Sequence, residues 1–465
     1  MITRLPVRLL RANTLRTIQN ARPSTALVES QTIRSSSTSS RYPSLSPNPS
    51  KKGIKIGYVF SALALLGISA TSYGLYQFYS TFTIYPDSST HPIRSKLRAA
   101  IRAESSSEYS RADTFFQQAY ELCLDLYKSS GELNSKEGLI NLSGIAVRWG
   151  GMWEKKNELE RALEVYDIGF QPIAYQIQST NQGSRGENSV DIVKRGAGLA
   201  LKLGDLWTLL GSMNPVAVGE AQSEAERYYT WAVEELMRLS LTEDQKEKVR
   251  EQMDNQEKGI QSNPPSSDAT GKDNKDGMDL PSWVGQVELV AAFERLGDLY
   301  SRQGKIELAQ PLLQQAITTL YPPPKKDSKP IPPPPISQRC HAATLMNNLS
   351  SSLVTAPSPS SQSIEASSRW ARQALSVSNS CKREADKSRN SKKVVPLRER
   401  EEVECELTAV VACYNLGKLA EMSKDTISAE QWFVRSEKLA TELGLRDAVL
   451  QARESLRRLK HPTIH

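Results

Sequence analysis

The side chains best able to bind a metal or to act as nucleophiles are scarce in this chain and poorly spaced for chemistry. Its 465 residues contain four histidines, which are His91, His341, His461 and His465. Its five cysteines are Cys123, Cys340, Cys381, Cys405 and Cys413. No histidine stands at metal-ligand spacing from a cysteine or a carboxylate, and no two cysteines form a C-x-x-C pair. The spacing therefore predicts no metal site.

The cysteines are expected to be buried free thiols, because unpaired cysteine behaves as a small hydrophobic residue in protein interiors. Disulfide pairing stays open for some of them. Cys405 and Cys413, however, would lie two turns apart on one helix, which is too far for them to bridge each other.

Other catalytic patterns are also missing. The glycine-containing stretches QGSRGENS and KRGAG lack the G-K-[ST] ending of a phosphate-binding loop. Asp205 and Asp298 occupy equivalent positions, but we interpret them as surface or capping carboxylates rather than as a catalytic pair. A hydrolase would need a nucleophile and a base, and we find no such pair. The sequence therefore predicts a protein that is not an enzyme, with no catalytic residue and no cofactor.

The positive charge of the chain is concentrated near its amino terminus. The formal net charge is +7, but residues 1–55 hold seven Arg and three Lys against one Glu, a net charge of +9. The remaining residues together carry a net charge of −2, so the main part of the chain is nearly neutral. This distribution argues against a nucleic-acid-binding protein, whose basic residues would form a patch on the folded domain.

The first 50 residues have the composition of a targeting segment. Arg4, Arg8 and Arg11 lie one helical turn apart, no acidic residue precedes Glu29, and a serine-rich run follows. Mitochondrial presequences are amphipathic, rich in Arg and Ser, and poor in acidic residues. Residues 1–50 are therefore interpreted as a mitochondrial presequence and a disordered serine-rich segment; the alternative is an ordinary basic tail.

An uncharged segment follows this leader. No charged residue lies between Lys55 and Asp87, which exceeds the length of about 20 residues needed to cross a bilayer. We expect one transmembrane helix over residues 54–80, with tyrosines near both of its ends. The lysines on its amino-terminal side place that end in the matrix and the rest of the chain in the intermembrane space of mitochondria, on the inner membrane.

The remaining sequence repeats one spacing. The pentapeptides LGDLW at 203–207 and LGDLY at 296–300 have an aromatic residue three places after glycine. After a gap of variable length come an Ala, a bulky residue four places later and a small residue three places after that. One weaker copy uses Ala100, Ala112 and Phe116, and another uses Ser350, Ala366 and Trp370. The positions expected to pack the repeats are Trp149, Gly150, Gly204, Trp207, Gly297, Tyr300, Ala309, Gly417, Ala429 and Phe433.

This spacing resembles the tetratricopeptide repeat, in which each copy is a helix hairpin and stacked copies bury a continuous core. The resemblance implies an all-α fold: a superhelix of about six hairpins over residues 91–442. Residues 443–460 form an amphipathic capping helix. Polar or Pro-rich insertions are expected to be exposed loops. They are 254–282, 321–337 and 382–400, with TLLGSMNPVAVGEAQS at 208–223 as a further one.

A row of polar residues is the candidate binding surface. In tetratricopeptide hairpins the first helix lines a concave groove, and the residue two places before the glycine position is expected to face it. These residues are Arg98, Arg148, Lys202, Arg295, Asn348 and Asn415. Asn can bond to the backbone of an extended peptide, and a basic row favours carboxylates. The alternative is a solvated face whose charge is relieved by neighbouring Glu residues.

The order of presequence, single membrane helix and repeats resembles the fungal adaptor subunits of the mitochondrial inner-membrane i-AAA protease. The resemblance rests on that order and on the LGDLW, LGDLY and NLGKLA hairpins. It implies a non-enzymatic adaptor that binds unfolded or misfolded polypeptides in the intermembrane space and delivers them to the protease. The implied partners are the protease, its other adaptor subunits, unfolded clients and the lipid bilayer, with no nucleic acid.

Two other functions remain open. An assembly or maintenance factor for a respiratory-chain complex can share the same anchor and repeats, and it would copurify with that complex. An import receptor of the outer membrane would face the cytosol, without a removable leader and with a chaperone-binding clamp. That clamp needs Asn directly after the glycine position, where this chain has other residues, such as Asp205 and Asp298.

Overall fold

The computed structural model describes most of the chain beyond residue 66. The described residues are 67–74, 76, 82–83, 85–86, 88, 90–133, 135–182, 190–240, 286–322, 333–355, 359–391 and 400–460. The expected presequence (1–50) and the expected insertion at 254–282 lie outside them. So does most of the expected membrane segment 54–80. Among the described residues, no helix has the length and apolar character needed to cross a bilayer.

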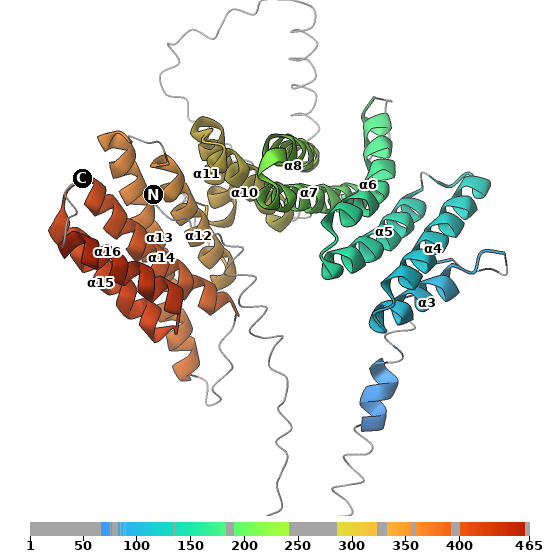
Figure 1. Ribbon diagram of the computed structural model, residues 1–465, viewed down its shortest axis with the longest axis horizontal. Coiled ribbons are helices and arrows are strands. Elements are labelled where there is room, and N and C mark those ends of the chain that lie inside the picture. The colour runs from blue at the N-terminus through green and yellow to red at the C-terminus, as the bar shows by residue number, and fades with distance from the viewer. Residues whose placement is uncertain are drawn as a thin grey trace, which may run out of the picture. The chain divides into compact units, whose positions relative to one another are not determined.

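Every regular element in the described part of the chain is a helix, which confirms the expected all-α class (Figure 1). The hairpin helices are α3 (Ile93–Ser105), α4 (Tyr109–Ser130), α5 (Lys136–Lys156), α6 (Leu159–Gln182), α7 (Val190–Met213), α8 (Val218–Ser240), α10 (Gln286–Arg302), α11 (Ile306–Leu320), α12 (Ile336–Leu353), α13 (Ser361–Ser391), α14 (Arg400–Met422) and α15 (Thr426–Glu442). A short 3-10 helix, Pro215–Ala217, precedes α8, and α16 (Arg446–Lys460) follows the last hairpin.

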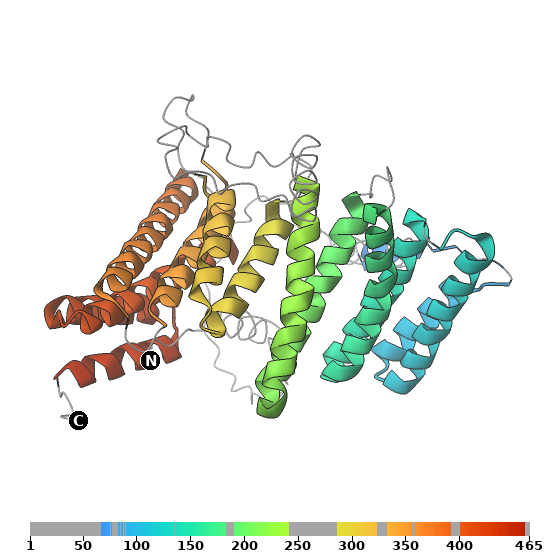
Figure 2. The ribbon, with the colours of Figure 1, turned by 90° about the horizontal axis from the view of Figure 1, so that it is seen from above.

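The chain divides at Lys96 into two compact units, and the hairpins belong to the second. In that unit each helix from α4 to α16 packs against the next described one along the chain, as Figure 2 shows for the row from α5 to α15. First helices also contact each other across hairpins, as α12 contacts α14. Contact with the next helix together with contact between successive first helices is typical of tetratricopeptide-type repeats, in which one hairpin alone cannot bury its apolar face.

Small residues in the first helix let the second helix approach closely. A Cβ added to Gly150 would lie 2.8 Å from the Tyr166 ring, and one added to Gly204 would lie 2.4 Å from Tyr229. In the last hairpin a Cβ on Gly417 would lie 2.7 Å from Phe433. These separations are shorter than real Cβ contacts, so the glycines are needed for close packing rather than for an unusual backbone conformation.

This packing predicts opposite effects for two glycines of α7. Gly204→Ala is expected to lower the free energy of unfolding by about 1–2 kcal/mol, because overpacking against Tyr229 outweighs the gain in helix propensity. Gly198 has no heavy atom near its Cβ position, so Gly198→Ala should raise that free energy by about 0.5–1 kcal/mol. Denaturant titration followed by circular dichroism measures both. Equal shifts in the two variants would contradict the packing role of Gly204.

The last helix covers the end of the hairpin stack. Tyr414, Ala429 and Phe433 form a buried cluster against which Leu456 and Leu459 of α16 pack. The exposed side of α16 carries charged residues, including Glu454 and Arg457. An amphipathic helix in this position separates the apolar core from water, as a terminal capping element of a repeat stack must.

Two segments expected to be loops are helical. Residues 208–223 belong to α7, the 3-10 helix and α8, and only Asn214 separates them, where its side chain caps the short helix by accepting from the Val216 N–H. Residues 382–391 of the expected 382–400 loop continue α13. The charged residues there have good helix propensity, and Cys381 and Ala385, four residues apart, are buried, which holds this end of the helix in place.

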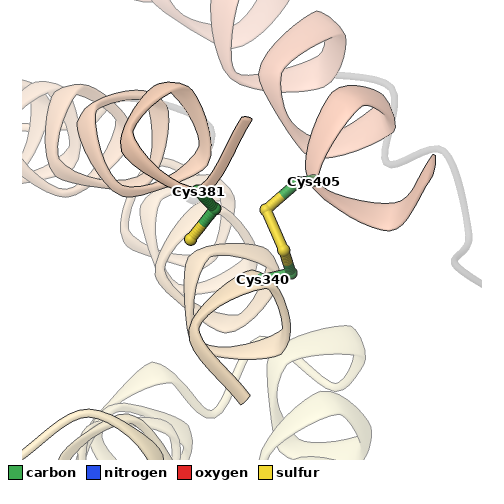
Figure 3. A group of neighbouring side chains, drawn as sticks. All are labelled: Cys340, Cys381 and Cys405. Carbon is green, nitrogen blue, oxygen red and sulfur yellow. A yellow bond between two sulfur atoms is a disulfide. The ribbon is translucent and has the colours of Figure 1, made fainter. Parts of the chain in front are cut away.

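The expectation of five free thiols is wrong for two cysteines. Cys340 of α12 and Cys405 of α14 form a disulfide, with their Cα atoms 4.8 Å apart (Figure 3). Cys123, Cys381 and Cys413 are free and buried. The two bridged residues are 65 positions apart in sequence but lie on neighbouring first helices. The bridge therefore links two successive hairpins covalently.

Candidate functional site

The predicted row of polar residues lies on the first helices, but its members differ in exposure. The side chain of Arg148 is 49% exposed, that of Lys202 39% and that of Arg295 30%. Arg98 and Asn348 are half-buried. Asn415 is only 2% exposed. The row therefore runs from partly exposed cations to a buried amide at its end.

The contact between α3 and α5 is made by charged side chains. Glu104 of α3 has a nearly buried side chain, and Arg148 Nη2 lies 3.3 Å from its Oε2. Lys155 Nζ lies 2.6 Å from the other oxygen of the same carboxylate. Arg148 is thus neutralised by the preceding first helix instead of being a free cation.

The same arrangement recurs between α5 and α7. Lys202 Nζ lies 2.6 Å from Glu154 Oε1, and the Tyr166 hydroxyl donates to Glu154 Oε2 at 2.8 Å. Burial and the neighbouring Glu154 carboxylate raise the pKa of Tyr166, so the hydroxyl keeps its proton and remains a donor. One carboxylate therefore joins the tyrosine of its own hairpin to the cation of the next hairpin.

A third copy connects α7 to α10. Arg295 Nε donates to Asp205 Oδ1 at 3.0 Å, and the Tyr229 hydroxyl donates to the same oxygen at 2.8 Å. Burial by itself would lower the pKa of Arg295, but the Asp205 carboxylate outweighs it and the pKa is raised. Arg295 stays charged and paired. Asp205 is accordingly a contact between repeats, and not the surface or capping carboxylate that the sequence suggested.

Double-mutant analysis can measure this contact. We expect Arg295→Met and Asp205→Asn to show a coupling energy of about 1–2 kcal/mol, since the pair is charged, hydrogen-bonded and partly shielded from water. The exposed pair Arg111–Glu108, with side chains 67% and 50% exposed, is the control and should show a coupling near zero. Urea unfolding of the four variants of each cycle supplies the values. Equal couplings in the two cycles would contradict a structural role for Arg295.

The contacts between the later first helices, α10 with α12 and α12 with α14, are made by polar groups that are mostly uncharged. His341 Nε2 and Glu294 Oε2 are 2.9 Å apart between α12 and α10. Between α12 and α14, the Thr344 and Thr408 hydroxyls are 2.8 Å apart. Further along the same pair of helices, the Asn415 amide donates to other buried polar groups. Its acceptors are Asn347 Oδ1 at 3.1 Å and Ser351 Oγ at 3.0 Å.

The expectation that Asn415 faces a bound peptide therefore does not agree with its position. Its side chain is buried, and its amide N–H groups bond to α12, because burying an amide without partners is unfavourable. Asn348, one residue beyond Asn347 on the helix, is half-buried. Of the two predicted amides, only Asn348 keeps the accessibility that ligand binding needs.

The structure thus favours the alternative interpretation of the basic row, in which nearby carboxylates relieve its charge. Which carboxylates pair with which cation was not predicted from the sequence. Glu104 and Glu154 both stand four residues after the glycine position of their own copy. This shared spacing could have indicated that they pair with the cation of the next copy. An acidic ligand would have to compete with these carboxylates for Arg148 and Lys202, so the row alone does not make a strong anion site.

No protein-family model matches this sequence, and no curated protein matches it either. Solved structures of low similarity do match. BtubC (BKLC) from P. vanneervenii is 12% identical with a TM-score of 0.39, and the match covers 75% of this chain and 93% of that chain. The S. pombe nuclear import adaptor Nro1 is 8% identical with a TM-score of 0.39, covering 78% and 97%. A tetratricopeptide repeat protein from Parabacteroides merdae is 9% identical with a TM-score of 0.22, covering 78% and 98%. Such scores establish no relative, so the description of this chain as a stack of tetratricopeptide-type hairpins rests on its own helix packing.

Proposed function

We propose that this protein is a non-enzymatic adaptor whose hairpin stack binds other polypeptides. The observation that carries the proposal is the succession of hairpins from α3 to α15, each first helix paired with the next through side chains. Stacks of this type offer an extended surface made from many helices, which suits a long, unfolded chain better than a small molecule.

The more specific proposal concerns location and partner. The Arg- and Ser-rich leader and the uncharged segment after Lys55 support an anchor in the mitochondrial inner membrane, with the amino terminus in the matrix. The hairpins would then lie in the intermembrane space. There they would hold unfolded or misfolded clients for the i-AAA protease, as the order of segments suggests.

Weak binding is sufficient for such an adaptor. Because its cations are already paired with carboxylates, the first-helix row would contribute little to affinity for acidic clients. A membrane anchor raises the effective concentration of a held client near a membrane-bound protease, which compensates for weak binding.

Affinity purification from detergent-solubilised mitochondria tests the specific proposal. Enrichment of an ATP-dependent inner-membrane protease is the expected result. Recovery of a respiratory-chain complex without that protease would overturn the proposal and favour an assembly factor. A chain with Gly204→Ala, in which one hairpin is loosened, should recover less client while still reaching the membrane.

Two asparagines distinguish client binding from folding. Asn348→Ala should weaken capture of an unfolded client by about fivefold, the equivalent of one hydrogen bond of about 1 kcal/mol, without changing stability. Asn415→Ala should instead lower the free energy of unfolding by about 1–3 kcal/mol, because it leaves buried groups of α12 without their donor. Client pull-down and urea unfolding measure the two effects. Unchanged capture by Asn348→Ala would place the client contact elsewhere.

A further inference from the structure

Three cysteines from three consecutive helices meet in one place, and two of them form the disulfide. Cys340 of α12 and Cys405 of α14 are bridged, and the sulfur atom of Cys381 of α13 lies within 4.8 Å of both of their sulfurs. Figure 3 shows the free thiol next to the bridge. All three residues are buried. A free thiol held this close to a disulfide has the components of a thiol–disulfide exchange reaction.

A buried guanidinium accompanies the thiol. Arg339, directly before Cys340, has a side chain that is 9% exposed, and its Nη2 lies 2.7 Å from Glu384 Oε2. Its Nε has no hydrogen-bond partner among the residues that the structure describes. Burial raises the pKa of the Cys381 thiol, and the positive charge of Arg339 acts against that rise. A nearby cation of this kind stabilises the thiolate, which is the reactive form of cysteine.

A small cavity reaches two of the three cysteines. Its lining includes Cys381 and Cys405, together with Lys382 and Glu406, but not Cys340. Lys382 Nζ and Glu406 Oε1 are 3.3 Å apart at this place. If the bridge opened, the sulfur of Cys405 would therefore face this cavity, whereas Cys340 does not line it.

We propose that Cys381 exchanges with the Cys340–Cys405 disulfide. The Cys381 thiol gives its proton to water, and the thiolate attacks the Cys340 sulfur. The bond between Cys340 and Cys405 breaks, a bond between Cys340 and Cys381 forms, and Cys405 leaves as a thiolate that takes up a proton at the cavity. The number of disulfides and thiols is unchanged, so no oxidant or reductant is consumed.

The exchange changes which helices are joined. In the structure the bridge links α12 to α14, in two different hairpins, whereas the exchanged bridge would link α12 to α13 within one hairpin. The covalent link between hairpins would then be lost, and one thiol would become available at the cavity.

Peptide mapping of the full-length protein tests the exchange. The protein is held in a glutathione redox buffer, its free thiols are alkylated at low pH, and its disulfide-linked peptides are identified by mass spectrometry without reduction. We expect two bridged forms, Cys340–Cys405 and Cys340–Cys381, with Cys405 alkylated in the second. Finding only the first form, with Cys381 alkylated throughout, would overturn the proposal.

Variants separate exchange from unfolding. Cys381→Ser should eliminate the second form completely, whereas Cys123→Ser, which removes a buried thiol of α4, should leave both forms as they are. In Cys405→Ser, where no bridge is left to exchange, oxidised glutathione from the buffer should take up two electrons and leave Cys340 and Cys381 bridged to each other. Bridges that include Cys123 or Cys413 would show that the chain had unfolded and that the Cys340–Cys381 bridge is not a property of the folded protein, which would also overturn the proposal.

Discussion

Reduction of the Cys340–Cys405 disulfide should lower the free energy of unfolding of the hairpins it joins by about 4 kcal/mol. The bridge closes a loop across a sequence separation of 65 residues. In the chain-entropy description, a loop of this length restricts the unfolded chain by roughly that amount. The comparison uses the unchanged chain with and without a phosphine reductant, so that core packing is the same in both measurements. Hydrogen exchange in α12 and α14, or guanidinium unfolding, reports the difference.

The matched control for this experiment is a chain without the bridge. The double variant Cys340→Ala and Cys405→Ala should unfold at the same denaturant concentration with and without the reductant. If the unchanged chain were also insensitive to reductant, the disulfide would not contribute to stability.

Phe433→Ala should be the most destabilising single substitution in the last hairpin, with a loss of about 3–5 kcal/mol in the free energy of unfolding. The ring is completely buried, lies against Gly417, and packs at 5.4 Å from the Tyr414 ring. It also belongs to the cluster that holds α16. Its removal should therefore increase hydrogen exchange in α16 as well as in α15.

The neighbouring aromatic residue provides the control. Trp432 is half-buried, and the guanidinium carbon of Arg435 lies 5.5 Å from the centre of its ring. Trp432→Ala removes a larger side chain from the same helix, yet it should cost about 1 kcal/mol or less, since a partly exposed side chain loses less burial. Equal losses in the two variants would show that position in the core does not decide the effect.

Much of the fold could be predicted from the repeat spacing, because that spacing reflects local contacts within one hairpin. Gly204 and Tyr229 are 25 residues apart, and the close approach that they make depends on residue size alone. The weaker copy that contains Ser350, Ala366 and Trp370 shows the limit of this reasoning. Ala366 and Trp370 are half-buried, whereas Ser367 and Ala371, one position later, are fully buried. A serine took the place of the small apolar residue there, and its hydroxyl bonds to Ser350.

The contacts between hairpins were harder to predict. They join residues far apart in sequence, such as Arg295 and Asp205 or Cys340 and Cys405, whose meeting depends on the angle at which hairpins stack. Periodicity carries no information on that angle. The exposed row was therefore predicted as a binding surface, although its cations serve first as links between helices.

Those links have a mechanical consequence. The joints from α3 to α10 depend on ion pairs at partly exposed positions, which dissolved salt weakens, whereas the joint between α12 and α14 depends on hydroxyl and amide groups and a covalent bond, which salt hardly affects. The contacts between first helices from α3 to α10 are therefore expected to loosen as the ionic strength of the surrounding fluid rises, whereas the spacing of α12 and α14 should stay the same.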